Sequence, residues 1–480
     1  MALWNGDSAD WESYITIEDL YVAYRKAKAE CFFDKVVPTA IKFAEYEKDI
    51  NKNLRNLFKK LSSSNHKWTT DLSFIGNYSY IPKSIDLSRW ESENKVIHYR
   101  ATDPVKDWKL RFEENNSKVK ANYRLIIDAE VDFHIVSALW VLKVGHLFEK
   151  KLDKKLSYGN RLRRYAKSPF LEPGGLGELN KNSPGLFQPY FSAYQAWRQN
   201  GLNSMRSSVE SGDSIYAITM DITSFFHNAD PSFILHPDFL ESINVELSEH
   251  DIDFTHHLLT AITTWYESTP DYENRIEGAI PVGLSASKIL SNILLESLDR
   301  QMGKELNPVY YGRYVDDIFL VIKQPENCNS GSRVLKYLVE KVPCIEKDDD
   351  NSLRLQFKYA PNSDLYFKPD KQKIFLLDSE HGLDLIDQIE NQIKRQSSEY
   401  RLLPDLPDSS SEMAKKALLA TPDAKLEADA LRKADGVSIR RLGFSLLFKD
   451  INSYAQDLNP ESWSEIRQEF YGLVERKRSF

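Results

Sequence analysis

Apolar residues recur with different periods along the chain and divide it into three parts. Helical spacing dominates residues 1–85, where Thr16 followed by Asp19 predicts a capping box at the start of a long helix. Short apolar runs typical of buried strands, mixed with helical segments, mark residues 86–380. Helical spacing returns in residues 381–480. The pattern therefore predicts a mixed helix-and-sheet region with a helical segment on each side.

Adjacent carboxylates interrupt one of the predicted strands. The sequence Tyr314–Asp317 (Tyr-Val-Asp-Asp) lies within an apolar, β-rich run that extends from Val309 to Ile322. Aspartate is unfavourable in a buried strand, so we interpret this segment as a tight hairpin turn that holds the acids at the lip of a cleft. An Asp-Asp turn of a plain hairpin is the alternative. A second predicted strand ends on Asp221, and three carboxylates at one sheet edge suit Mg²⁺.

A glycine-containing loop lies between these acidic segments in the sequence. Pro281-Val282-Gly283 precedes apolar residues at helical spacing from Ile289 to Leu298, and small residues there allow a nucleotide to approach the backbone. Phe226, five residues after Asp221, would wall the sugar of a bound nucleotide; core packing is the alternative for this side chain.

These segments, in this order, resemble the polymerase core of reverse transcriptases. Residues 220–226 are similar to the first catalytic motif, Pro281–Ser287 to the nucleotide loop, and Tyr314–Asp317 to the Tyr-x-Asp-Asp motif. Residues 365–371 resemble the following lysine motif. Two further segments, 123–135 and 157–161, resemble motifs of the fingers. The resemblance implies an α+β, right-hand polymerase with fingers, an RRM-like palm and a helical thumb, plus helical N-terminal and C-terminal extensions.

The resemblance also implies roles for individual residues. Two Mg²⁺ ions, or Mn²⁺, would be held by the catalytic acids and one backbone carbonyl: Asp221, Asp316, Asp317 and Ile222. Nucleotide contacts would come from Arg124, Arg161, Phe226, Pro281, Gly283, Ser287 and Lys371, with Lys373 as the alternative to Lys371. Nucleic-acid contacts would come from Lys154, Lys155, Arg163, Arg164, Tyr314, Arg440 and Arg441.

Charge and composition refine the expected partners. The net charge of −8 argues against a nucleic-acid partner only if the charge is spread evenly over the chain. It is not, because residues 150–167 contain eight basic residues and one acidic residue. That segment suits phosphate neutralisation, although a solvated helix face is the alternative for its first part. Cys31, Cys328 and Cys344 are scattered and indicate neither disulfides nor a zinc site. No uninterrupted apolar run of membrane-spanning length occurs, so we expect no membrane association and a cytoplasmic location.

One departure from the family pattern points to a particular class. Many group II intron and retron enzymes have glutamine between the proline and glycine of the loop, whereas Val282 is familiar from abortive-infection and defence-associated bacterial enzymes. The class implies an RNA-directed DNA polymerase in antiphage defence that makes DNA from dNTPs on a structured non-coding RNA. A homo-oligomer or a second defence protein would be a further partner. Template-independent or protein-primed synthesis remains open, as does a silent RNA-binding scaffold; Phe226 disfavours an RNA polymerase.

Overall fold

The computed structural model describes residues 11–33, 39–86, 120–165, 177–326, 330–348 and 352–396, together with residues 103, 106, 109 and 328. The chain divides into two compact units. One comprises Met1–Ser79 with Leu125–Asp387, and the other Tyr80–Arg124 with Gln388–Phe480. The predicted domain boundaries near residues 85 and 380 stay predictions.

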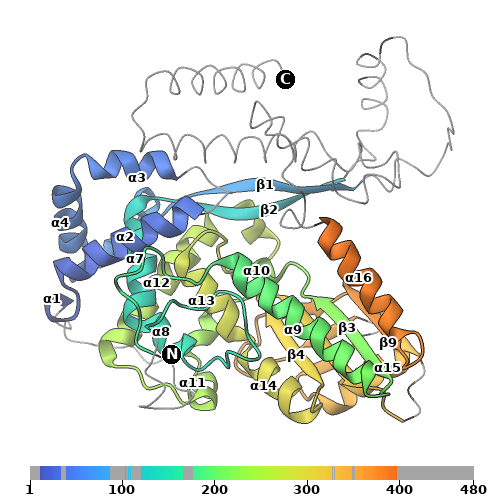
Figure 1. The fold of residues 1–480 in the computed structure, drawn as a ribbon. Coiled ribbons are helices and arrows are strands. Elements are labelled where there is room, and N and C mark those ends of the chain that lie inside the picture. Colours follow the sequence, from blue (N-terminus) through green and yellow to red (C-terminus); the bar gives the residue numbers. More distant parts are fainter. Residues whose placement is uncertain are drawn as a thin grey trace. The chain divides into compact units, whose positions relative to one another are not determined.

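A four-stranded antiparallel sheet forms the centre of the larger unit, in the order β4 (Tyr310–Tyr314), β5 (Asp317–Lys323), β3 (Ile215–Asp221) and β9 (Gln372–Leu377). Strands β4 and β5 form the hairpin that the sequence predicted, and β3 ends on Asp221 as expected. The long helix α9 (Tyr190–Glu210) packs against β4, β5 and β3 (Figure 1). Because β3 and β5 are almost wholly buried, their ends are held on a rigid base.

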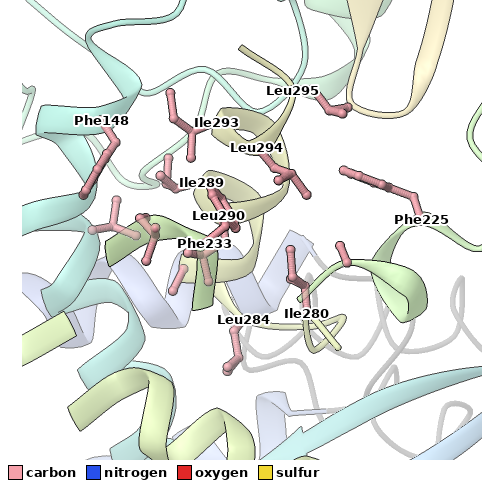
Figure 2. Packing of buried hydrophobic residues seen from close by; sticks show 14 of the residues in the cluster. Phe148, Phe225, Phe233, Ile280, Leu284, Ile289, Leu290, Ile293, Leu294 and Leu295 are labelled. Atoms are coloured by element: carbon pink, nitrogen blue, oxygen red, sulfur yellow. The ribbon is translucent and has the colours of Figure 1, made fainter. Parts of the chain in front are cut away.

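Helices build the hydrophobic core beside this sheet. Helix α13 (Ser285–Leu294) follows the Pro-Val-Gly loop as predicted, and its apolar side chains gather between Phe148 and Phe225 (Figure 2). The segment α7–η2–α8 (Val131–Trp140, Val141–Gly145 and His146–Glu149) packs against α13. It is the one candidate membrane span among the described residues by length and composition, with 78% of the tested window buried inside the protein. That burial is typical of a core helix.

The N-terminal helices belong to the same unit. They are α1 (Trp11–Tyr14), α2 (Ile17–Phe33), α3 (Ala40–Glu47), α4 (Ile50–Leu61), η1 (Lys67–Thr69) and α5 (Leu72–Ile75). The predicted capping box is present, because the Asp19 amide donates to Thr16 Oγ1 at 3.1 Å and the Thr16 amide donates to Asp19 Oδ2 at 3.1 Å. Helix α2 packs on α7, so this part contributes to the core.

Two further sheets and nine further helices complete the part of the chain that the structure describes. Strands β1 (Gly76–Asp86) and β2 (Lys120–Ala129) form a two-stranded sheet, and β6 (Ile345–Lys347), β7 (Leu353–Leu355) and β8 (Leu365–Phe367) form a three-stranded one. The other helices are α10 (Phe225–Asn228), η3 (Pro231–Leu235), α11 (Pro237–Ile243), α12 (Glu249–Glu267), η4 (Pro270–Glu273), α14 (Glu296–Glu305), α15 (Gly331–Lys341), η5 (Pro369–Lys371) and α16 (Gly382–Gln396). The fold is mixed helix and sheet, as the sequence predicted.

Candidate active site

Three aspartates lie in neighbouring backbone positions where β3 ends and β5 begins. Asp221 and Asp317 are direct partners in the antiparallel ladder between these strands. Asp316 precedes Asp317 in the two-residue turn of the β4–β5 hairpin, and its carbonyl accepts a hydrogen bond from the Ile222 amide at 3.3 Å. The backbone therefore brings together the acids that lie about a hundred residues apart in the sequence.

The turn that carries Asp316 is backbone-strained. Val315 has φ of +61°, a left-handed conformation that β-branched residues rarely adopt. Arg313 Nη1 donates to the Val315 carbonyl at 2.7 Å, and Gly159 lies against the same residue. A Cβ on Gly159 would stand 2.8 Å from Val315 Cγ2, so only glycine fits there without movement. Strain of this kind persists only where the surroundings fix it, and here they do.

A buried arginine supports the turn from beneath. The Arg313 side chain is fully buried and donates to both carboxylate oxygens of Asp299, at 2.7 and 2.6 Å, and to Asn292 Oδ1 at 2.8 Å. Burial disfavours the charged guanidinium, but the Asp299 carboxylate outweighs it and raises the pKa of Arg313. Asn292 also donates to the Gly159 carbonyl at 2.8 Å. The network thus joins α13, α14 and the 156–159 loop to the hairpin.

The electrostatics of the acids favour a bound cation. Burial first, and then repulsion from Asp221, raise the pKa of Asp317 to about 6, while Lys371 opposes the shift. The Lys371 ammonium lies 3.2 Å from Asp221 Oδ2. Within the described residues no group of three or more His, Cys, Asp or Glu side chains is arranged as a metal site. Two repelling carboxylates are nevertheless the oxygen ligands that a hard divalent ion prefers, so Asp221 and Asp317 fit one.

The predicted nucleotide loop lies next to Phe226. The Phe226 carbonyl accepts from the Ile280 amide at 2.8 Å, and its partly buried ring packs against Phe225. Gly283 has φ of +123°, and a Cβ there would lie 3.3 Å from the Ile127 carbonyl oxygen, which explains the glycine. Both readings of Phe226, as sugar contact or as core, fit a partly buried ring.

Two other predicted residues of this loop lie inside the protein. Pro281 is buried, and Ser287 is only 2% exposed. The Ser287 hydroxyl has no hydrogen-bond partner within the part of the chain that is described. Direct contact of Ser287 with a nucleotide would therefore require the helix start to open, and its assignment stays a prediction.

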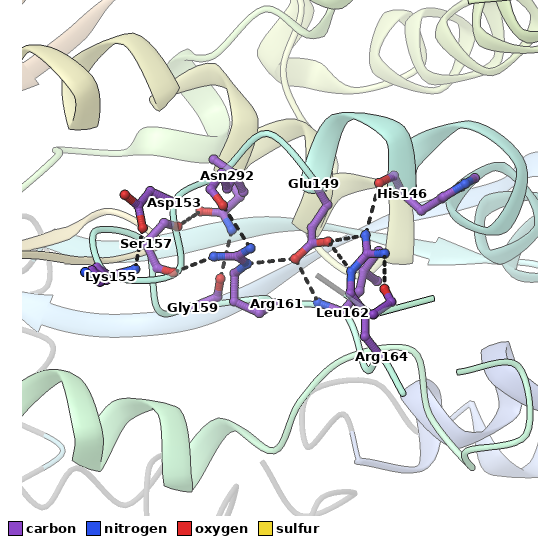
Figure 3. Close-up of polar contacts among 12 residues, drawn as sticks. His146, Glu149, Asp153, Lys155, Ser157, Gly159, Arg161, Leu162, Arg164 and Asn292 are labelled. Carbon is purple, nitrogen blue, oxygen red and sulfur yellow. Dashed lines mark hydrogen bonds and ion pairs between the residues drawn. The ribbon is translucent and has the colours of Figure 1, made fainter. Parts of the chain in front are cut away.

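Two of the predicted arginines, Arg161 for the nucleotide and Arg164 for nucleic acid, are held by the protein itself. Glu149 is almost fully buried and accepts from Arg161 Nε through one oxygen and from Arg164 Nη2 through the other, both at 2.7 Å (Figure 3). Arg161 also donates to the carbonyls of Ser157 and Leu152, at 3.0 and 3.1 Å. With these contacts the Arg161 side chain holds its own loop, and its role as a triphosphate ligand stays a prediction.

The other predicted nucleic-acid residues differ in their surroundings. Arg163 Nε donates to the Phe187 carbonyl at 2.7 Å, whereas Lys154 and Lys155 are exposed. Tyr314 is only 6% exposed and packs edge-on against Tyr190 and Tyr194. Exposed Arg124 and Lys373 lie on β2 and β9, and Arg124 belongs to the smaller unit. Arg440 and Arg441 lie outside the described residues.

Sequence reasoning missed the residues that support the turn. Arg313 interrupts an apolar strand directly before the Tyr-Val-Asp-Asp segment, and Asn292 interrupts the apolar face of α13. A charged or amide side chain at a buried position requires partners, which is the signal that would have identified both. Glu149, at the end of an apolar helical run, carries the same signal.

The chain belongs to the reverse transcriptase family. The family model for reverse transcriptase (RNA-dependent DNA polymerase) matches residues 114–403, which include the β3 and β5 carboxylates and Lys371. None of the curated proteins matches this chain. The protein is therefore an RNA-directed DNA polymerase, a nucleotidyltransferase that takes a nucleic-acid template and dNTPs, and its family uses divalent metal ions.

Proposed function

We propose that this polymerase is a bacterial, defence-associated reverse transcriptase that copies a structured non-coding RNA into DNA. The observation that carries its catalytic part is the register that sets Asp221 opposite Asp317 at the ends of two buried strands. The defence class is supported by the sequence of the loop, in which Val282 stands between Pro281 and Gly283. A cytoplasmic location, and a second copy or a second defence protein as partner, belong to the same proposal.

Two divalent ions, Mg²⁺ with Mn²⁺ as the alternative, are assigned to Asp221, Asp316, Asp317 and the Ile222 carbonyl. Ions held there would supply Lewis-acid activation of the primer 3′-hydroxyl and would neutralise charge on the triphosphate. The chain contributes rigidity, because the acids stand on strand ends and on a turn that Arg313 anchors. Positioned charge of this kind requires little reorganisation during phosphoryl transfer.

Other side chains have supporting roles in this proposal. The Lys371 ammonium lies next to Asp221 and neutralises charge on the triphosphate. The backbone carbonyl of Phe226 accepts a hydrogen bond from the nucleotide loop, which holds the residue in place. Its ring excludes a 2′-hydroxyl and so selects deoxyribonucleotides. In right-hand terms, the four-stranded sheet serves as the palm, the segment before it as fingers and the region after residue 381 as the thumb.

Primer extension by the purified protein, with RNA that co-purifies from its native locus, tests the proposal. The reaction contains Mg²⁺ and labelled dNTPs, and both the product and the bound RNA are sequenced. Asp316→Ala is compared with Asp238→Ala, which removes an exposed carboxylate on α11. We expect DNA complementary to the RNA from the wild type and from Asp238→Ala, and none from Asp316→Ala.

Two other outcomes would contradict parts of the proposal. DNA that requires Asp316 but matches no RNA would establish template-independent synthesis. No DNA from any variant, with one RNA species firmly bound, would favour a scaffold.

A further inference from the structure

An exposed aromatic surface adjoins the catalytic hairpin. Tyr190 and Phe191, at the start of α9, are 65% and 55% exposed. Tyr194, one turn further along, is partly buried and stacks on Tyr190, with ring centroids 5.5 Å apart and planes 13° from parallel. Single exposed aromatic residues are common, but here Tyr190 is backed by the stacked Tyr194 and followed directly by the exposed Phe191, so three aromatic side chains gather at one helix start. We call Tyr190, Phe191 and Tyr194 the α9 platform.

Two rings of the α9 platform, Tyr190 and Tyr194, are fixed to the catalytic turn. Tyr190 and Tyr194 each meet the ring of Tyr314 edge-on at 5.2 Å between centroids, with planes at 81° and 79°. Tyr314 is only two residues before Asp316, and its hydroxyl points to the Tyr190 carbonyl at 3.4 Å. A group that binds to the exposed Tyr190 ring is therefore held at a fixed position relative to Asp316 and Asp317.

Two charge effects are consistent with this closeness. Burial raises the pKa of both Tyr190 and Tyr194, and the Asp317 carboxylate contributes to both shifts. Both phenols thus stay neutral at physiological pH, which suits stacking against a base. A raised pKa is unfavourable for a hydroxyl that must act as a nucleophile.

The reaction determines which group reaches this surface. The carboxylates require a primer 3′-hydroxyl beside them, so the terminal base of the primer strand is a flat group that must lie close to Asp317 during the reaction. Stacking on aromatic side chains accepts any base, as a polymerase requires at a primer end. We propose that Tyr190 and Phe191 stack on the 3′-terminal base of the primer strand and so position the primer end for extension. This inference rests on the catalytic role proposed for Asp317.

Fluorescence of a base analogue tests the stacking directly. A DNA primer with 2-aminopurine at its 3′ end is annealed to RNA, and a second duplex carries the analogue well inside the primer. The variants are Tyr190→Leu, Phe191→Leu and Tyr190→Phe, which keeps the ring but removes the hydroxyl. Tyr21→Leu, on α2, is the control for loss of an exposed tyrosine ring.

We expect the terminal probe alone to be quenched by the wild type, by Tyr190→Phe and by Tyr21→Leu. Tyr190→Leu and Phe191→Leu should lose the quench and raise the KM for primer by about 5-fold to 100-fold, with the KM for dNTP little changed. Both positions are largely exposed, so the variants should fold normally.

Three outcomes separate the possibilities. Equal quenching and equal primer KM in all variants would overturn the proposal. Loss of synthesis in Tyr190→Phe, with DNA attached covalently to the wild-type protein, would also overturn it and identify the Tyr190 hydroxyl as a priming group. Selective quenching without extension by the wild type would support the α9 platform while contradicting the proposed polymerisation.

Discussion

At the scale of single residues, the site depends on groups that are unfavourable where they stand. Asp221 and Asp317 repel each other across one ladder position, and Val315 adopts a backbone conformation that its side chain disfavours. Each cost is met by a neighbour: Lys371 lies beside Asp221, and Arg313 fixes the Val315 carbonyl. Costs of this kind persist in functional sites because the surrounding fold imposes them.

Gly159→Ala tests how closely the turn must be positioned. The new Cβ would meet Val315 Cγ2 at 2.8 Å and the Val315 nitrogen at 3.0 Å, so the turn must shift by several tenths of an ångström. We expect kcat to fall by about 10-fold to 100-fold with a small change in Tm, because misplacement of reacting groups affects the rate steeply. Steady-state extension assays and thermal denaturation measure the two effects.

Gly331→Ala is the matched control, since a Cβ there would have only an ordinary contact at 3.6 Å with Ile374 Cδ1. Full activity of Gly159→Ala would show that close fixation of the turn is unnecessary.

At the scale of elements, the strands could be predicted from the sequence because burial requires runs of apolar residues. The β3 strand, the β4–β5 hairpin and the start of α13 all lie where apolar runs predicted them. The partners of the buried charged residues could not be predicted from the sequence. The Arg313–Asp299 and Arg161–Glu149 pairs depend on which elements contact one another in the folded protein. The same basic segment that the sequence assigned to phosphate contains arginines that hold loops together.

The Arg313–Asp299 pair joins β4 to α14 and should serve both stability and activity. Arg313→Met leaves the buried Asp299 carboxylate without its cation and should cost about 3–5 kcal/mol of unfolding free energy. Adding Asp299→Asn removes that charge while keeping an acceptor for the Tyr311 hydroxyl, so the double variant should recover much of the loss. Urea denaturation measures these differences.

Activity should not recover with stability in the double variant, because the Val315 carbonyl still lacks the Arg313 donor. An unchanged KM for dNTP with a reduced kcat would indicate a positioning role. Wild-type kcat in the double variant would show that Arg313 serves stability alone.

Helix α7 should make the fold sensitive to acid. Burial above all, with a smaller effect of Lys42, lowers the pKa of His134 to about 4 from 6.5. Between these values the unfolded chain binds a proton that the folded state excludes, so stability falls as the pH falls, by up to about 3 kcal/mol. We expect His134→Leu to flatten this dependence between pH 6.5 and pH 4, measured by urea denaturation at each pH.

His256→Leu is the control, because that side chain is exposed on α12. If both variants keep the wild-type dependence on pH, other groups determine the acid response.

At the scale of the whole molecule, the N-terminal helices are part of the same compact unit as the catalytic aspartates, Met1–Ser79 with Leu125–Asp387. Lys26 on α2 is 1% exposed and donates to the carbonyls of Asn180, Ser183 and Gly185 at 2.8, 2.6 and 3.1 Å. On the next turn, Glu30 accepts from the Leu186 and Phe187 amides and forms an ion pair with Lys288 of α13 at 2.7 Å. The sequence predicted a helical N-terminal extension here, and these contacts give α2 a structural role in the larger unit.

Lys26→Met tests this role. Three carbonyls would lose the Lys26 ammonium as a donor, although the Ser183 hydroxyl still donates to those of Asn180 and Gly185, and we expect a loss of about 2–4 kcal/mol in the free energy of unfolding. Lys28→Met is the matched control two residues away, since Lys28 forms an exposed ion pair with Glu47 that should contribute about 1 kcal/mol or less. Hydrogen exchange adds a local measurement: in Lys26→Met the Leu186 and Phe187 amides should exchange faster, because their loop keeps Glu30 but loses Lys26 as an anchor to α2. Equal stability and equal exchange in the two variants would show that the Lys26 contacts do not stabilise the larger unit.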